Sequence, residues 1–335
     1  MNRTKISYCD FSWNPVRGCA RVSPGCQSCY AERIAARFSG SSDEDLWRGR
    51  GIPYVSHAPF VGVARMTADG PRWTGEVSLV ESKLDEPLRA RRSAEKFLAQ
   101  HGRKPIVFVE DMGDLYYEAV PVEWQDRVFA VMALADWFDY LVLTKRAEQM
   151  AEHALSPGRR SEIYESAATE AFDEWSVAGR SGQLPAHAQI SDGQDGSAVK
   201  ITTAWPLPHV MLGVSAEDQP RFDERVGHLY RLSQAGWRTW MSLEPLLGPI
   251  DMRMGGMSLA EYAPHRPFAL ERIAIGGESG PGARPCAVEW VESLVSQARA
   301  AGVKCHVKQD SGPKSGIQGR IPNHIWKETW HGERS

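Results

Sequence analysis

The 335-residue sequence contains no hydrophobic run that approaches the roughly 20 apolar residues needed to cross a membrane. The N-terminal stretch MNRTKISYCDFSW also lacks the apolar core that is typical of a secretory signal peptide. Hydrophobic residues make up 42% and charged residues 24% of the chain, as in ordinary globular proteins. We therefore expect a cytoplasmic protein with a sizeable core.

The sequence has no strong excess of charge of either sign, because its formal net charge is only -3. This excludes a global basic field for nucleic acid, although a local basic channel remains compatible with it. Two phosphate-binding fingerprints are absent as well. The glycine-rich segment IAIGGESGPGARP at 273–285 is not G-x-G-x-x-G and is not followed by GK[ST], which disfavours a Rossmann or Walker phosphate site.

Cysteines are few, but three of the six lie close together as C-x6-C-x2-C, at Cys19, Cys26 and Cys29. A C-x2-C pair lets two thiolates reach one metal or cluster, and a loop containing Pro24 and Gly25 can turn the third toward them. In a reducing compartment such clustering favours a metal or cluster over disulfides, although cysteines without any ligand remain the alternative. Three thiolates leave one coordination position for a small molecule, another side chain or water.

Short apolar runs alternate with longer amphipathic segments along most of the chain. The predicted strands are residues 5–12, 76–80, 105–111, 140–146, 209–215, 239–245, 272–279 and 304–309. The predicted helices between them include residues 84–102, 122–137, 217–236 and 287–302. This alternation predicts parallel strands joined by crossovers. We predict a single α/β domain over residues 1–335, a parallel (β/α) barrel of six to eight strands, with an insertion at 155–208.

Polar residues follow six of the predicted strands at the points where the strands end. They are Glu110, Lys145, Glu217, Glu244, Glu278 and Lys308. Any one of them alone is compatible with a solvated strand terminus. In a parallel barrel, however, all carboxyl ends open on the same mouth, so these side chains are expected to converge beside the cysteine loop. We predict that they bind a cofactor or substrate there.

Several segments together resemble a known family. They are WNPVRGCARVSPGCQSCYAER, VFVEDMGDLYYEAVP, YLVLTKR, VMLGVSAEDQ, SLEPLLGPID and IAIGGESGPGARP. The combination resembles the phage gene-product 37/68 family, also called three-Cys-motif proteins, which is related to radical-SAM barrels. The resemblance extends from about Asp10 to Gln309 and implies a TIM-like or radical-SAM-like barrel.

The resemblance also implies a cofactor set and a chemistry. A [4Fe-4S] cluster would bind Cys19, Cys26 and Cys29, S-adenosylmethionine would chelate its open iron, and Tyr30 would lie near the nucleoside. An external electron donor would allow reductive cleavage of S-adenosylmethionine to a 5'-deoxyadenosyl radical. Nucleic acid or a nucleotide is the expected substrate, and a three-Cys-motif partner protein is a further expected partner. No individual catalytic residue is assigned.

Two other functions are compatible with the same residues. The first is a zinc-dependent hydrolase or nuclease in which His57 or a water completes a three-thiolate site. Three thiolates are an electron-rich set for hydrolytic zinc, which weakens that alternative. The second is a non-enzymatic iron-sulfur or zinc module that acts with a partner protein. Metal analysis distinguishes zinc from iron.

Overall fold

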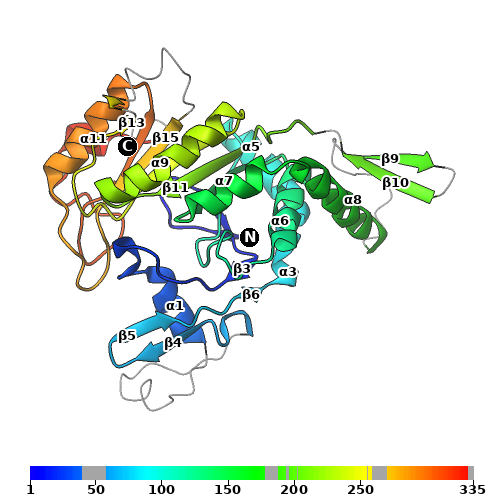
Figure 1. Ribbon diagram of the computed structural model, residues 1–335, viewed down its shortest axis with the longest axis horizontal. Coiled ribbons are helices and arrows are strands. Elements are labelled where there is room, and N and C mark those ends of the chain that lie inside the picture. Colours follow the sequence, from blue (N-terminus) through cyan, green and yellow to red (C-terminus); the bar gives the residue numbers. More distant parts are fainter. Residues whose placement is uncertain are drawn as a thin grey trace.

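The computed structural model describes residues 1–39, 58–177, 188–193, 196–201, 203–254, 256–258 and 270–330. Its main feature is an eight-stranded sheet with the order β1-β2-β7-β8-β11-β12-β15-β16. The strands are β1 (Asn2–Arg3), β2 (Phe11–Trp13), β7 (Ile106–Val109), β8 (Asp139–Thr144), β11 (Val210–Ser215), β12 (Arg238–Leu243), β15 (Leu270–Gly276) and β16 (Lys304–Gln309). All neighbours are parallel except β1, which pairs antiparallel with β2. The sheet curls into a half-barrel that is not closed (Figure 1).

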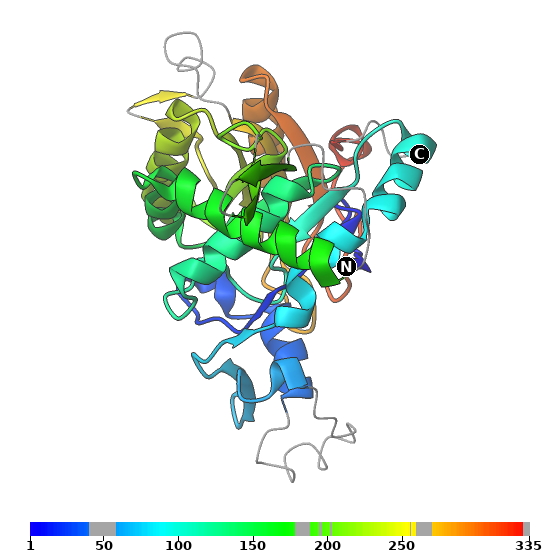
Figure 2. The same ribbon diagram turned by 90° about the vertical axis from the view of Figure 1, so that its right-hand side faces the viewer.

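Helices follow the strands as the alternating pattern predicts and cover the convex face of the sheet (Figures 1 and 2). They are α3 (Glu81–Leu84), α4 (Glu86–Arg89), α5 (Arg91–His101), α6 (Val122–Leu134), α7 (Ala147–Leu155), α9 (Gln219–Gln234), α11 (Val288–Ala300) and α12 (Asn323–Trp326). Local chemistry fixes several ends. The Asp218 carboxylate caps α9 by accepting from the Arg221 amide at 3.1 Å, and Gly102 ends α5 in the left-handed conformation with φ 68°.

Side chains alternate between the two faces of the strands and form two apolar clusters. In β7, Val107 and Val109 pack outward against the helices, whereas Phe108 packs on the concave side. Trp240 of β12 fills much of that concave interior and donates from its indole nitrogen to the Val142 carbonyl at 3.0 Å. Gly213 of β11 is required beside it, because a Cβ there would lie 2.2 Å from the indole nitrogen.

Side chains bridge the open seam between the first and last strands. The Ser7 hydroxyl lies 2.8 Å from Nε2 of His306 on β16. The ring of Tyr8 packs at a tilt against that of Trp330, with ring centroids 4.8 Å apart, and the Trp330 indole donates to the Ile273 carbonyl at 3.0 Å. The N-terminal segment and Trp330 therefore complete the interior of the half-barrel.

One predicted strand does not join this sheet. Residues 76–80 contribute only β6 (Ser78–Leu79), which pairs antiparallel with β3 (Val16–Arg17) outside it. The eighth place in the sheet belongs instead to β1. The reason is that the Val80 amide donates a hydrogen bond to the Pro15 carbonyl at 2.7 Å. This short run is therefore paired with the loop that follows β2.

Two extensions project from the half-barrel in Figure 1. The lower one joins α1 (Tyr30–Phe38) to the hairpin of β4 (Ala64–Thr67) and β5 (Gly70–Trp73), through contacts that include Ala35 and Ala64. The other extension belongs to the predicted insertion and contains α8 (Arg159–Val177) and the hairpin of β9 (Ala188–Gly193) and β10 (Gly196–Ile201). No described strand of 155–208 enters the main sheet. Ile163 and Ala167 of α8 are buried in the main core.

Shortening the insertion tests how much of it the fold needs. We expect that replacing residues 178–202 with a short glycine-serine linker lowers the unfolding temperature by no more than a few degrees, because β9 and β10 pair only with each other. Thermal unfolding followed by circular dichroism measures this. A control that also deletes Arg159–Val177 should unfold far earlier, since it removes Ile163 and Ala167 from the core. Comparable losses in both variants would contradict the expectation.

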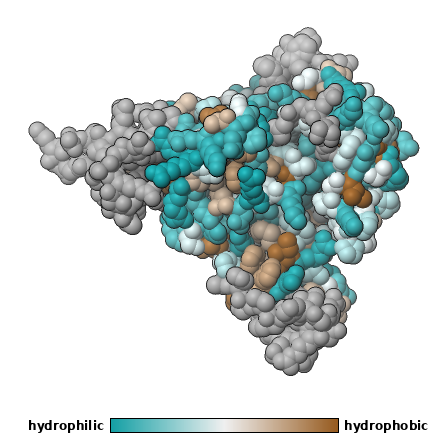
Figure 3. Space-filling model, turned by 180° about the vertical axis from the view of Figure 1, so that it is seen from behind, coloured by the Kyte–Doolittle hydropathy of each residue, from teal (hydrophilic) through white to brown (hydrophobic). Residues whose placement is uncertain are grey.

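One face of the molecule has the ordinary character of a globular protein surface. No helix in the described ranges is long and apolar enough to span a membrane. The face in Figure 3 is mainly hydrophilic, with a few hydrophobic residues between polar ones. Such scattered exposure is normal for globular proteins.

Candidate functional site

The cysteine loop leaves β3 and passes through a short 3-10 helix at Pro24–Cys26 before α1 begins at Tyr30. Cys19, Cys26 and Cys29 all line one cavity of about 170 Å³. All six cysteines of the chain are free, and Cys9, Cys286 and Cys305 are buried elsewhere. Cys19, Cys26 and Cys29 therefore share one cavity, and the other three cysteines lie apart from it.

A buried ion pair supports the cysteine loop. The Gly25 amide donates to Oε1 of Glu217 at 2.8 Å, and Nη1 of Arg225 lies 3.3 Å from Oε2 of the same carboxylate. Glu217 has 0% and Arg225 2% of its surface exposed. Burial opposes ionisation of Glu217, but hydrogen bonds from Ser23 and Gly25 and the charges of Lys145 and Arg225 outweigh it and lower the pKa. Glu217 is a support for the loop and lines neither cavity of the site.

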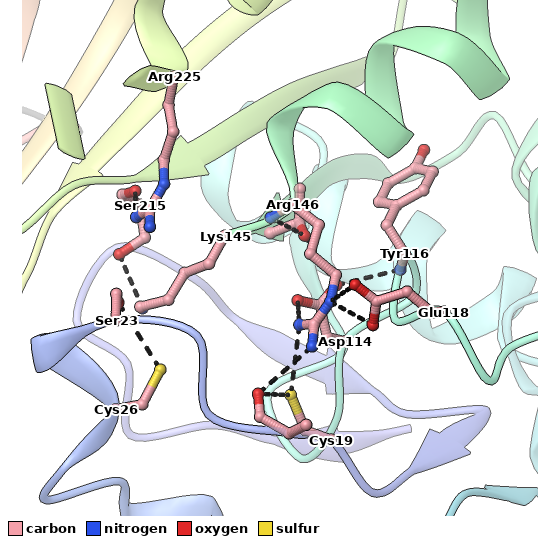
Figure 4. Close-up of polar contacts among 12 residues, drawn as sticks. Cys19, Ser23, Cys26, Asp114, Tyr116, Glu118, Lys145, Arg146, Ser215 and Arg225 are labelled. Atoms are coloured by element: carbon pink, nitrogen blue, oxygen red, sulfur yellow. Dashed lines mark hydrogen bonds and ion pairs between the residues drawn. The ribbon is translucent and has the colours of Figure 1, made fainter. Parts of the chain in front are cut away.

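Arg146 anchors the other end of the loop (Figure 4). Its guanidinium donates to Asp114 at 2.9 Å and to Glu118 at 3.0 Å, and its Nη1 lies 3.7 Å from Sγ of Cys19. In Figure 4 the Cys26 sulfur points toward Ser23, whose hydroxyl oxygen is 3.8 Å away. Charged and polar groups from two strand ends therefore fix where the thiols lie.

Burial favours the protonated form of two of the three thiols. Burial raises the pKa of Cys19, with a further contribution from Asp114, and Arg146 only partly offsets this. Burial also raises the pKa of Cys29. Binding a metal would displace these protons, so metal affinity should increase with pH. No three His, Cys, Asp or Glu side chains in the described part of the chain converge on a position for one metal ion.

A second cavity of about 220 Å³ adjoins the first at the carboxyl ends of the strands. The two cavities share Gly25, Cys29, Tyr30, Phe108, Leu143, Lys145 and Ser215. Of the six predicted strand-end residues, Glu110 lines the first cavity, Lys145 lines both, and Glu244, Glu278 and Lys308 line the second. The strand ends therefore converge as expected, except for Glu217.

Opposite charges face each other in the second cavity. Nζ of Lys308 lies 3.2 Å from Oε1 of Glu244. The other carboxylate oxygen of Glu244 accepts from the Tyr8 hydroxyl at 3.0 Å and from the Ser242 hydroxyl at 3.2 Å. On the opposite side, Nζ of Lys145 donates to the Ser215 hydroxyl at 3.0 Å. A ligand that carries both an acidic and a basic group would find partners for each.

The Glu278 carboxylate already accepts hydrogen bonds from within the protein. It accepts from the Arg284 amide at 2.9 Å and from the Arg284 guanidinium at 3.0 Å, which ties the turn after β15 to the cavity wall. Arg284 also donates to the side chain of Gln27 in the cysteine loop at 3.0 Å. Burial alone would raise the pKa of Glu278, but the hydrogen bonds from Arg284 outweigh it and lower the pKa.

Tyr30 stands between the two cavities. Its side chain is 45% exposed, but its hydroxyl is enclosed and donates to the Asp111 carbonyl at 2.8 Å. Burial of this hydroxyl raises its pKa well above the ordinary value for tyrosine. The ring is therefore fixed at the mouth, where a flat ligand can stack on it.

Glu110 has the most unusual environment of the predicted residues. Its φ angle is 66°, in the left-handed region, and among the described residues no other non-glycine residue has a positive φ. Its side chain is nearly fully buried, and Oε1 accepts from the Val16 amide at 2.8 Å. Oε2 has no hydrogen-bond partner among the described residues. Burial raises the pKa of Glu110, and Asp111 and Asp114 add to the effect against the charge of Arg17.

Sequence reasoning did not assign Tyr8, Asp114 or Arg284 to the site. Arg284 and Asp114 each follow a strand end by a few residues, so a broader reading of the loops after the strands would have included them. Tyr8 had no such signal, because its place depends on how the N-terminal segment enters the half-barrel. His57, the predicted additional zinc ligand, lies outside the described residues.

Together, the curled parallel sheet and the cysteine-lined cavity at its carboxyl edge define an α/β half-barrel protein with a candidate cofactor site. The sequence model of a family described as "Protein of unknown function (DUF5131)" matches residues 3–326, and the chain belongs to this family. No curated protein matches the sequence. Among solved structures, the apo form of 3-keto-D-glucoside 4-epimerase, YcjR, from E. coli is similar at 11% identity and a TM-score of 0.32, covering 72% of this chain and 83% of that chain. Such a likeness does not indicate a shared function.

Proposed function

We propose that this protein is a radical-SAM-like iron-sulfur enzyme of the phage gene-product 37/68 type, on a TIM-like or radical-SAM-like barrel. The observation that carries the proposal is the pair of adjoining cavities. One is lined by Cys19, Cys26 and Cys29, and the other by charged groups of both signs. When bound, a four-iron cluster would supply the electron that cleaves S-adenosylmethionine to start radical chemistry.

The residues of the first cavity fit such a cluster in their chemistry. Three thiols are the donors that iron-sulfur clusters take, and here none is used in a disulfide. A single zinc ion needs all its donors at about 2.0–2.3 Å from one point. The described side chains do not converge in that way, so zinc would require the loop to rearrange. In a cluster each cysteine binds a different iron, so the three sulfurs need not meet at one point. Cys19, Cys26 and Cys29 would hold it.

The second cavity fits an amino-acid group that carries opposite charges. Lys145 and Lys308 offer ammonium groups for a carboxylate, and Glu244 offers a carboxylate for an ammonium group. Tyr30 places an aromatic ring where a nucleoside would enter. These residues would bind and orient S-adenosylmethionine. Glu278 would act through Arg284, because its oxygens are already used.

The family resemblance extends the proposal to the partners. It supports a nucleic acid or nucleotide substrate, an external electron donor and a three-Cys-motif partner protein. The zinc hydrolase and the non-enzymatic binding module remain the competing functions. The metal content of the protein distinguishes zinc from iron, and formation of 5'-deoxyadenosine distinguishes the enzyme from a non-enzymatic iron-sulfur module.

Two measurements on the anaerobically purified protein test this proposal. We expect iron and sulfide to be present in near equal amounts, and we expect 5'-deoxyadenosine to form when the reduced protein is incubated with S-adenosylmethionine. Lys145→Met should lose most S-adenosylmethionine binding in calorimetry, because it removes the ammonium group that lines both cavities. Its thermal unfolding should change little, since Lys145 makes only the Ser215 hydrogen bond within the described residues.

The controls separate binding from stability. Lys304→Met removes an exposed lysine at the start of β16, at the opposite end from the cavity, and should affect neither measurement. Stoichiometric zinc without iron would refute the proposal in favour of a zinc protein. A large loss of stability with intact binding in Lys145→Met would show that this lysine only supports the fold.

A further inference from the structure

Three carboxyl groups line the cysteine cavity, and two of them are already used inside the protein. Asp114 accepts from the Arg146 guanidinium at 2.9 Å, and Asp111 accepts from the side-chain amide of Asn14. Glu110 differs because its Oε2 is buried and has no hydrogen-bond donor among the described residues. A buried carboxyl oxygen without a partner is costly, so a bound group that contacts it would recover that cost.

The local structure fixes the Glu110 carboxyl group in the wall of the cysteine cavity. The Val16 amide occupies Oε1 at 2.8 Å and thereby fixes the orientation of the carboxyl group. Gly113 leaves the space beside Oε2 open, because a Cβ at that position would lie 3.2 Å from it. Holding Glu110 at φ 66° costs conformational energy that glycine would avoid. Strain of this kind persists where the surrounding structure enforces it, and it is found most often at functional sites.

The chemistry of the donors indicates what Oε2 contacts. Three thiols leave one coordination position of a four-iron cluster without a protein ligand. A carboxylate oxygen is a suitable ligand for iron, and Glu110 lines the same cavity as Cys19, Cys26 and Cys29. We propose that Glu110 is the fourth protein ligand of the centre that these cysteines hold, and that S-adenosylmethionine displaces it on binding. This inference rests on the proposed function and adds a resting state to it.

Two consequences follow from a displaceable carboxylate. Removing it takes away a competitor, so S-adenosylmethionine should bind more tightly to a Glu110 variant. The iron that it holds should also be lost more readily on oxidation, because that iron then has no protein ligand. A glutamate that contacts S-adenosylmethionine directly would have the opposite effect on affinity.

The experiment uses the full-length protein reconstituted anaerobically with iron and sulfide, as wild type, Glu110→Gln and Glu110→Gly. The glutamine keeps an acceptor for the Val16 amide but is a weak iron ligand, and the glycine relieves the backbone strain at φ 66°. We expect all three proteins to bind iron and the unfolding temperature of Glu110→Gly to equal or exceed that of wild type. Both variants should bind S-adenosylmethionine about tenfold more tightly, because no competing state must be displaced.

Loss of iron provides the second readout. After mild ferricyanide oxidation, the electron paramagnetic resonance signal of a three-iron cluster should appear several-fold faster in both variants than in wild type. Cys305→Ser, a buried cysteine away from the cavity, is the control and should behave as wild type. Unchanged affinity and unchanged iron loss would overturn the inference, as would weaker binding of S-adenosylmethionine. A wild-type protein that binds no iron would instead refute the proposed function itself, and the inference with it.

Discussion

Serine at Cys19, Cys26 or Cys29 should reduce the iron content of anaerobically purified protein to near background and remove its visible absorbance. A hydroxyl is a poorer ligand for iron than a thiolate, and each of the three sulfurs lines the same cavity. No neighbouring cysteine can substitute, because the other three are buried elsewhere in the fold. Iron and sulfide analysis, with the absorption spectrum, measures the effect.

Cys305→Ser is the matched control for these variants. Cys305 is buried on β16 and contributes to the core, so its replacement should reduce stability slightly and leave the iron content unchanged. Circular dichroism should show that the three loop variants remain folded, because their side chains are only partly buried. If all four variants retain iron equally, the cysteine cavity is not the metal site.

The alternating pattern of the sequence predicted most of the sheet. Six of the predicted strands coincide with β7, β8, β11, β12, β15 and β16, because each is a short apolar run followed by a helical segment. The pattern failed at residues 76–80 and at β1. The two-residue strand at Asn2–Arg3 is exposed and joins the sheet through backbone hydrogen bonds, which leave no hydrophobic signal.

The convergence of the strand ends also followed from the sequence, since parallel strands all point the same way. The ion-pair partner of each charged residue could not be predicted from the sequence. Glu217, Glu278 and Glu244 all follow a strand in the same sequence pattern. Glu217 pairs with Arg225 and Glu278 pairs with Arg284, whereas Glu244 faces Lys308 across the cavity. These pairings depend on side-chain directions that only the folded chain defines. The left-handed conformation of Glu110 had no sequence signal either, because such positions usually carry glycine.

Replacing Glu217 should destabilise the protein more than any other single charge removal described above. Glu217→Ala leaves Arg225 charged and buried, with the Ser215 carbonyl at 2.6 Å as a hydrogen-bond acceptor and the exposed Glu224 carboxylate 3.9 Å away. Breaking a buried pair in this way costs about 3–5 kcal/mol. For a protein of this size we expect the unfolding temperature to fall by roughly 4–7 °C. The Gly25 amide also loses its acceptor, so the cysteine loop should bind iron more weakly.

A matched pair on the surface supplies the control for this prediction. Glu271 pairs with Arg238 at 2.8 Å, but their side chains are 34% and 30% exposed, so Glu271→Gln should cost no more than about 1 kcal/mol. Glu217→Gln keeps an acceptor for the Gly25 amide, so its loss of stability should lie between those of Glu217→Ala and Glu271→Gln. Equal unfolding temperatures for the Glu217 and Glu271 variants would contradict a supporting role for the buried pair.

The pH dependence of unfolding gives this prediction a second, independent readout. Hydrogen bonds and nearby positive charges outweigh burial and lower the pKa of Glu217, so its ionised form stabilises the folded state. That contribution is fully present above the ordinary glutamate pKa of about 4.3 and is lost as pH falls through the lowered folded value. The difference in stability between wild type and Glu217→Gln should therefore be largest near pH 7 and shrink below about pH 4. A difference that stays constant across this range would mean that the charge of Glu217 does not hold the loop.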